Sequence, residues 1–204
     1  MGGNTKYLMQ TEIEAKFLNI KPADLRISLE NHGATLIHEE RLMRRKVFDN
    51  PSGDLRKIGG WIRVRDEGDK ITLSYKQLND RTLHGTKEIS LDISNFEAMC
   101  DFLLATGFVC KSYQETKRER WELDGVEVTL DTWPWIPPFI EIEGKQEEDL
   151  KVVVSKLGLN WNNALHGSVE TAYQAVYEVT EDEIDSWENI TFSSVPDWLE
   201  VHRK

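Results

Sequence analysis

The sequence has few of the residues that build disulfide frameworks, zinc sites or membrane spans. Its 204 residues include only two cysteines, Cys100 and Cys110, and these form no CxxC pair. Its five histidines form no HxxxH or HExxH pattern, so a histidine-based zinc site is not indicated. No apolar run reaches transmembrane length, and no signal-peptide core is present. These absences predict a reduced, cytoplasmic chain with no membrane partner.

Positive charge is also in the minority. Lysine and arginine number 25 against 36 aspartates and glutamates, which gives a net charge of −11. Proteins that coat nucleic acid are normally basic, so no nucleic-acid partner is expected. Much of the acid excess lies late in the chain, in residues 146–149 and 178–188. The earlier part can therefore still hold a local positive pocket.

Alternating and helical periodicities predict an antiparallel α+β domain of about eight strands. Helices are expected near residues 23–31, 94–106, 147–157 and 168–179, and the second should begin with Ser94 as N-cap and Glu97 closing a capping box. Residues 1–179 form the expected domain. Residues 180–204 form an acidic C-terminal extension that is either docked or partly disordered.

Each predicted strand carries its charges on one face and its apolar residues on the other. In the stretch QTEIEAKF, Glu12, Glu14 and Lys16 alternate with Ile13, Ala15 and Phe17, which is the period of a strand. The same alternation exposes these charged residues on the other strands: Arg63, Arg65, Lys76, Glu88, Arg118, Arg120, Glu127, Asp131, Glu141 and Glu143. For any one strand alone, a solvated polar face would be the ordinary interpretation.

Like charges cluster on these faces, as Glu-x-Glu twice and Arg-x-Arg twice. A solvated sheet more often mixes signs, because opposite charges on neighbouring strands attract. The segregation predicts an eight-stranded antiparallel β-barrel with a charged interior, whose apolar outer faces are covered by helices. Such an interior suits a polyanion held with divalent cations, since arginine and lysine bind phosphate and carboxylates bind Mg²⁺ or Mn²⁺. No Walker-type glycine loop is present, so side chains would hold the phosphates.

The order of these motifs resembles the CYTH superfamily, the triphosphate tunnel metalloenzymes. EIEAK fits the ExExK signature of that family, and VFDNP, IRVR, YK, KE, RERW, VTLD and FIEIE follow in the family order. The resemblance covers roughly residues 10 to 175. It differs at TWPWIPP, where many relatives have a short glycine turn, and in the tail beyond Val179.

The resemblance implies an eight-stranded tunnel that binds a small-molecule triphosphate with Mg²⁺ or Mn²⁺. It implies metal ligands at Glu12, Glu14, Glu141 and Glu143, and candidate catalytic residues at Glu88 and Asp131. It also implies phosphate-binding side chains at Lys16, Arg63, Arg65, Lys76, Arg118 and Arg120. By contrast, we expect Lys70 and Glu122, near strand ends, to be solvated, and Tyr173 to be a packing residue. The oligomeric state stays open between a monomer and a homodimer.

Three functions remain open. The first is a metal-dependent phosphohydrolase acting on tripolyphosphate, thiamine triphosphate or a nucleoside triphosphate. The second is a class IV adenylate cyclase, and the third is a non-catalytic module that binds polyphosphate or nucleotide. Both Glu-x-Glu pairs are present, which disfavours simple anion binding, since that would need the cations but not the metal ligands. Hydrolysis of tripolyphosphate ranks first because it requires no pocket for a base.

The site can be tested with the substitutions Glu14→Ala and Arg65→Ala. We expect each variant to fold and to lose metal-dependent turnover, because one removes a metal ligand and the other a phosphate ligand. Circular dichroism verifies folding, and phosphate release measures turnover. Two folded variants with full activity would show that the tunnel assignment is wrong.

Overall fold

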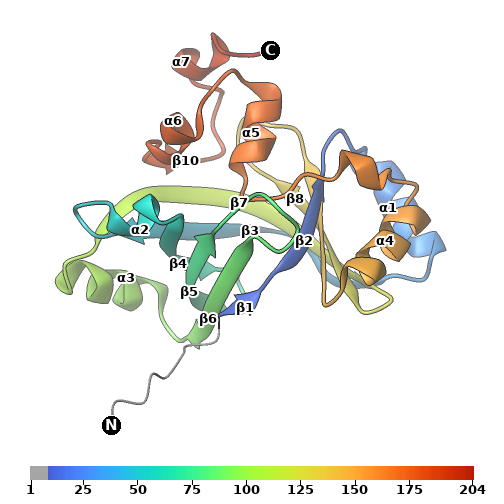
Figure 1. The fold of residues 1–204 in the computed structure, drawn as a ribbon, viewed down its shortest axis with the longest axis horizontal. Coiled ribbons are helices and arrows are strands. Elements are labelled where there is room, and N and C mark those ends of the chain that lie inside the picture. The colour runs from blue at the N-terminus through green and yellow to red at the C-terminus, as the bar shows by residue number, and fades with distance from the viewer. Residues whose placement is uncertain (1–8) are drawn as a thin grey trace.

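The protein is described here by a computed structural model, whose description covers residues 9–204; the start of the expected domain, residues 1–8, lies outside it. One sheet dominates the structure (Figure 1). Its strands are β1 (Gln10–Thr11), β2 (Ile13–Phe17), β3 (Thr35–Asp49), β4 (Gly60–Asp66), β5 (Ile71–Leu78), β6 (Thr86–Ile93), β7 (Val109–Leu123), β8 (Val126–Thr132), β9 (Phe139–Gly144) and β10 (Asn189–Ile190). The helices are α1 (Pro22–Asn31), α2 (Asp54–Lys57), α3 (Phe96–Ala105), α4 (Glu147–Lys156), α5 (Glu170–Val176), α6 (Glu181–Asp185) and α7 (Asp197–Glu200), with a 3-10 turn, η1, at Trp161–Asn163.

The two edges of the sheet meet at Glu12, so the sheet is nearly closed into a barrel. Its strand order is β1-β6-β5-β4-β3-β7-β8-β9-β2, and every neighbouring pair on this path is antiparallel. The two ends of this order, β1 and β2, are separated in the chain by Glu12 alone, whose N–H donates to the Thr86 carbonyl at 3.0 Å. The predicted antiparallel barrel flanked by helices is thereby confirmed, with the first predicted strand divided into β1 and β2.

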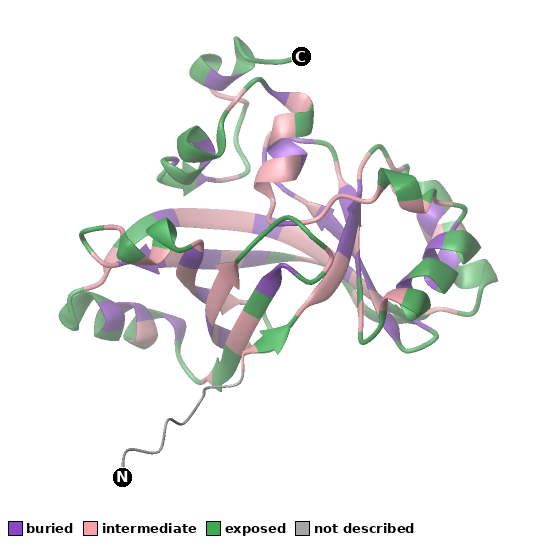
Figure 2. Cartoon of the chain, viewed as in Figure 1, coloured by how far each residue is buried: buried purple, intermediate pink, exposed green. Residues whose placement is uncertain are grey.

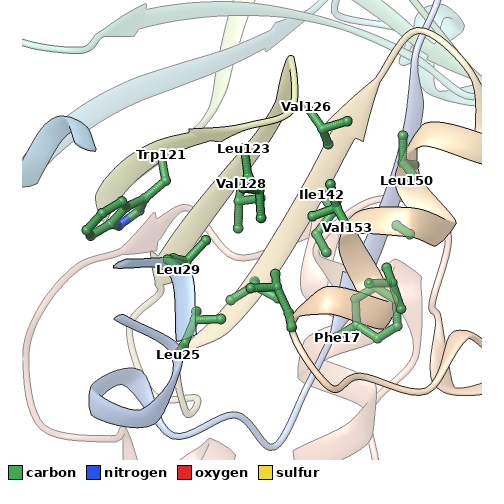
Figure 3. Packing of buried hydrophobic residues seen from close by; sticks show 14 of the residues in the cluster. Phe17, Leu25, Leu29, Trp121, Leu123, Val126, Val128, Ile142, Leu150 and Val153 are labelled. Carbon is green, nitrogen blue, oxygen red and sulfur yellow. The ribbon is translucent and has the colours of Figure 1, made fainter. Parts of the chain in front are cut away.

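The outer faces of the strands are apolar and are covered by helices. Helices α1 and α4 pack on β2, β8 and β9, where Leu25 and Leu29 meet Val128 and Ile142, and Leu150 and Val153 complete the layer (Figure 3). Helix α3 covers β3 and β4 through Phe96, Cys100 and Leu103. Buried positions in Figure 2 accordingly recur along the strands and on the inner sides of these helices. This is the inside-out arrangement predicted from the alternation.

The N-cap predicted for the second helix is wrong. Helix α3 begins one residue later, and the side chain of Asn95 accepts a hydrogen bond from the Ala98 N–H at 2.9 Å. Glu97 does not close a capping box, because its carboxylate reaches the cations Arg44 and Lys46 on β3. Asparagine and serine are about equally good caps, so local sequence could not decide between these adjacent positions.

The C-terminal extension is docked and ordered. Strand β10 pairs in parallel with β7, and the aromatic cluster beside it joins the extension to the loop between β8 and β9. Trp135 of that loop meets Trp187 edge-on with 5.9 Å between ring centroids, and Trp187 meets Trp198 at 5.3 Å. The Tyr177 hydroxyl donates to the Trp135 carbonyl at 2.6 Å and stabilises a residue whose φ is +69°. The unusual TWPWIPP segment therefore anchors the tail.

Ion pairs also hold α6 against the barrel. Arg56 of α2 binds Asp182 at 2.8 Å and Asp185 at 3.1 Å, and Arg81 in the loop before β6 binds Glu181. Within residues 9–204, no helix is both long enough and apolar enough to cross a membrane.

A buried carboxyl lies under α6. Glu170 Oε2, at the start of α5, is buried without a hydrogen-bond partner. Burial and the nearby Asp185 and Glu181 carboxylates raise the pKa of Glu170 to about 7, against a smaller opposing effect of Arg81. Because the folded state holds this proton more tightly than the unfolded chain, the stability that it contributes is lost as pH rises from about 4.5 to about 7.

We therefore expect Glu170→Gln to stabilise the protein relative to wild type increasingly over this pH range, by on the order of 1–3 kcal/mol at pH 8. Urea unfolding of both proteins between pH 4.5 and 8 measures the difference. The matched control is Glu178→Gln, at an exposed position two residues after the end of α5. Its free energy of unfolding should differ from that of wild type by the same amount at every pH. Parallel stability curves for Glu170→Gln and wild type would contradict the expectation.

Candidate functional site

The charged residues predicted from the sequence come together inside the barrel. Strand register places Glu14 opposite Glu143 and Lys16 opposite Glu141 on β2 and β9. On the next two strands of the wall, Arg118 of β7 lies opposite Asp131 of β8. The β5–β6 wall sets Lys76 opposite Glu88. Within residues 9–204, every one of these residues except Glu143 makes an ion pair with a side chain that projects into the same interior.

The first ion-pair network centres on Glu141. Lys16 Nζ lies 3.1 Å from one oxygen of Glu141 and 2.9 Å from Glu14, and it donates to the Gly167 carbonyl at 2.6 Å. Arg118 Nη2 lies 2.7 Å from the other oxygen of Glu141, and Arg118 donates to the two oxygens of Asp131 from Nε and Nη2, each at 2.6 Å. Burial opposes the charge on each residue, but the two flanking cations outweigh it and lower the pKa of Glu141. Glu141 is therefore an ionised carboxylate with a cation on each oxygen.

The second network joins the start of the chain to β5 and β6. Lys76 Nζ lies 2.9 Å from Glu12 and 3.7 Å from Glu88, while Arg63 Nη2 lies 3.2 Å from Glu88. Burial and a hydrogen bond to Glu88 raise the pKa of Glu12 to about 8. Burial opposes ionisation of Glu88 too, but the same hydrogen bond together with Lys76 and Arg63 lowers its pKa. The titrations of Glu12 and Glu88 are therefore linked, with the pKa of Glu12 raised and that of Glu88 lowered.

Three carboxylates lie side by side across β2, β9 and β8. Glu14, Glu143 and Glu127 are register partners in that order. The Glu143 side chain is open to solvent at one end, but desolvation of its carboxyl between the barrel walls, followed by the charges of Glu14 and Glu127, raises its pKa. We call Glu14, Glu143 and Glu127 the acidic row. Glu127 is a member that the sequence interpretation treated only as a lining residue.

The acidic row suits a hard divalent cation. Carboxylate oxygens are the ligands that Mg²⁺ and Mn²⁺ prefer, and a cation there would relieve the repulsion that raises the Glu143 pKa. Within residues 9–204, no three acidic, histidine or cysteine side chains already form a metal cage. Mg²⁺ typically uses one or two carboxylates and takes its remaining ligands from water and substrate phosphates, so two adjacent carboxylates fit it. Of the four predicted ligands, Glu14 and Glu143 are register partners, and Glu14 also pairs with Lys16, whereas Glu12 and Glu141 lie within the two networks.

Two predicted cations have carboxylate partners nearby. Arg65 pairs with Glu67 through a 2.9 Å bond from Nε, and Arg120 pairs with Glu127 at 2.6 Å. Glu67 was missed because it lies in the hairpin turn rather than in an alternating strand. Lys70 is close to half exposed and Glu122 is exposed, as expected, and Tyr173 is fully buried in the aromatic cluster.

Arg45 is the largest omission from the predicted site. It projects from β3 into the interior, is 7% exposed, and lies opposite Arg65 in the register. The segment RRK offered no contrast between faces, because Arg44 and Lys46 carry charge on the outer side, where both lie over the Phe96 ring of α3. Alternation identifies an inner face only when the outer face is apolar.

The chain is similar to several proteins of known structure. A conserved hypothetical protein from Pyrococcus furiosus superposes with a TM-score of 0.62 at 22% identity, over 76% of this chain and 94% of that one. A predicted adenylate cyclase from Vibrio parahaemolyticus superposes with a TM-score of 0.70 at 14% identity, over 82% and 99%. A predicted adenylyl cyclase from Hippeastrum, described with a dominant triphosphatase activity, gives 0.52 at 16%, over 87% and 95%. At these identities the likeness establishes the fold alone.

Among curated proteins, none matches the chain at a significant level. The family model described as the CYTH domain matches residues 10–177, which include every strand of the barrel wall and both ion-pair networks. The order of motifs in the sequence, the nearly closed antiparallel barrel and this match agree, and the chain belongs to the CYTH family.

Proposed function

We propose that this chain is a phosphohydrolase that cleaves a triphosphate in a reaction dependent on a divalent metal ion, Mg²⁺ or Mn²⁺. The observation that carries the proposal is the division of the interior into an acidic row and a cluster of guanidinium groups around Arg63, Arg65 and Arg118. The first suits metal ions and the second suits phosphate. The triphosphatase activity described for the Hippeastrum relative is consistent with this assignment.

In this proposal Glu14 and Glu143 hold the metal, with Glu141 and Glu127 near them in the register and Glu12 within reach of the charge of Glu14. A bound divalent ion supplies charge neutralisation and lowers the pKa of a coordinated water. The phosphates are held by Lys16, Arg63, Arg65, Lys76, Arg118 and Arg120.

The two candidate catalytic residues have different parts. Asp131 is 1% exposed and bound on both oxygens by Arg118, so it orients that guanidinium toward the interior. Glu88 lies between Arg63 and Lys76, which favour its ionised form and lower its pKa. We assign Glu88 the role of orienting the attacking water, since its lowered pKa makes it a weak proton acceptor.

Hydrolysis ranks above cyclisation because other side chains of the protein already pack against both tryptophans of the TWPWIPP segment. Trp133 lies under the Arg45 guanidinium at 4.7 Å, and Trp135 packs between Trp187 and Trp198. Neither ring is free to stack on an adenine, whereas tripolyphosphate needs no base pocket.

The activity can be tested by product analysis with tripolyphosphate, ATP and thiamine triphosphate, each offered with Mg²⁺ and with Mn²⁺. We expect phosphate release that requires the metal, with no cyclic AMP from ATP. Cyclic AMP together with pyrophosphate would instead identify a cyclase. Tight tripolyphosphate binding without turnover in either metal would identify a binding module.

The acidic row can be tested with Glu143→Gln. The substitution keeps the side-chain volume but removes the charge, and we expect Mn²⁺ binding to weaken by at least about tenfold, since even outer-shell partners of metal ligands contribute about 10- to 100-fold. Electron paramagnetic resonance of free Mn²⁺ measures the affinity. Glu148→Gln is the control, because Glu148 is also exposed but lies on α4, outside the barrel. Equal affinities for Glu143→Gln and wild type would remove Glu143 from the metal site.

A further inference from the structure

Arg45 differs from the other cations of the interior in having no carboxylate partner. In the part of the chain that the structure describes, Lys16, Arg63, Arg65, Lys76, Arg118 and Arg120 all form ion pairs. Arg45 forms none there: its Nη2 donates to the Thr116 hydroxyl at 2.9 Å, and its buried Nε has no hydrogen-bond partner.

The surroundings of Arg45 intensify this imbalance. Burial, followed by the charges of Arg65, Arg63 and Arg118, lowers the pKa of Arg45 well below its usual value. The main acidic influence on it is Asp131, whose two oxygens are already bound by Arg118. A guanidinium remains protonated in proteins, so the charge persists and is uncompensated. A buried charge of this kind is costly unless an anion meets it.

We call the part of the interior around Arg45, Thr116 and Trp133 the Arg45 corner. Aromatic side chains cover one side of it. The Trp133 ring lies 4.7 Å from the guanidinium carbon, and Tyr173 meets Trp133 edge-on at 6.4 Å between centroids. Tyr173 is fixed in turn by its hydroxyl, which donates to the Pro134 carbonyl at 2.9 Å. The stacked face is occupied and Thr116 takes one donor, so the Nε donor remains for a ligand.

The corner also lies away from the acidic row. Asp131, beside Arg45, and Glu127, in the acidic row, are four residues apart on β8, which corresponds to about 13 Å along an extended strand. A metal-bound phosphate at the acidic row and a phosphate at Arg45 would therefore be different groups of one extended polyanion.

We propose that Arg45 is a phosphate-binding residue, kept without a carboxylate partner so that the phosphate group of the substrate furthest from the acidic row completes its charge pairing. This rests on the proposed function in taking the anion to be a triphosphate. It adds a residue that the family motifs in the sequence did not indicate.

The test is the binding of inorganic tripolyphosphate to the full chain in EDTA, measured by isothermal titration calorimetry for wild type, Arg45→Gln and Arg45→Lys. Without metal there is no metal-dependent turnover, so the titration reports on Arg45 even if the product analysis shows no hydrolysis. Loss of a charge-assisted contact should weaken binding by about 10- to 100-fold in Arg45→Gln. Arg45→Lys should be intermediate, because lysine keeps the charge but lacks the fork of donors.

Arg44→Gln is the matched control. This substitution removes the same charge from the residue directly before Arg45. Arg44 lies on the outer face of β3, where it pairs with Asp66 and Glu97. We expect its affinity to equal that of wild type. The ligand-free melting temperature of Arg45→Gln should be no lower than that of wild type, because an uncompensated buried charge has been removed.

Unchanged tripolyphosphate affinity in Arg45→Gln would overturn the proposal, as would an equal loss in Arg44→Gln. Weakened binding accompanied by a lower ligand-free melting temperature would also overturn it, since Arg45 would then support the fold rather than the ligand. A wild-type chain that does not bind tripolyphosphate in EDTA would overturn this inference alone, because the proposed function is decided separately by the product analysis with Mg²⁺ and Mn²⁺.

Discussion

Charge pairing across the interior of the barrel is the constraint to which the rest of the structure conforms. One continuous ion-pair network crosses the four neighbouring strands β2, β9, β8 and β7. It consists of Lys16, Glu141, Asp131 and Arg118. Charges taken out of water need partners in good geometry, and only closely spaced strands with opposed side chains provide them. Because the inner faces are charged, the apolar faces point outward, and α1, α3 and α4 are required to cover them.

The pairing is incomplete at two places, and these places have opposite signs. The acidic row holds Glu143, whose pKa is raised by partial desolvation and by the charges of Glu14 and Glu127 although one end of its side chain is open to solvent. The Arg45 corner holds a guanidinium that makes no ion pair with the described residues. A protein tolerates such local deficits when a bound group corrects them. Metal ions at the acidic row and a phosphate group at Arg45 would supply the missing opposite charges.

The C-terminal extension and the TWPWIPP segment depend on each other. Trp135 adopts a left-handed backbone conformation that is unfavourable for a residue with a side chain, and hydrogen bonding by Tyr177 together with packing by Trp187 and Trp198 stabilises it. The same segment places Trp133 beneath Arg45. The C-terminal extension is therefore connected to Arg45 through the TWPWIPP segment, by way of the Trp133 ring.

The sequence by itself determined the barrel, its inward charges and the family, because strand alternation and motif order are local properties that survive without knowledge of partners. It did not determine how those charges pair, that Asn95 rather than Ser94 caps α3, or that the tail docks on the barrel. Nor could it assign Arg45, since β3 is charged on both faces there. These features depend on register between distant strands and on which helix covers which face, and only the tertiary structure brings those residues within contact distance.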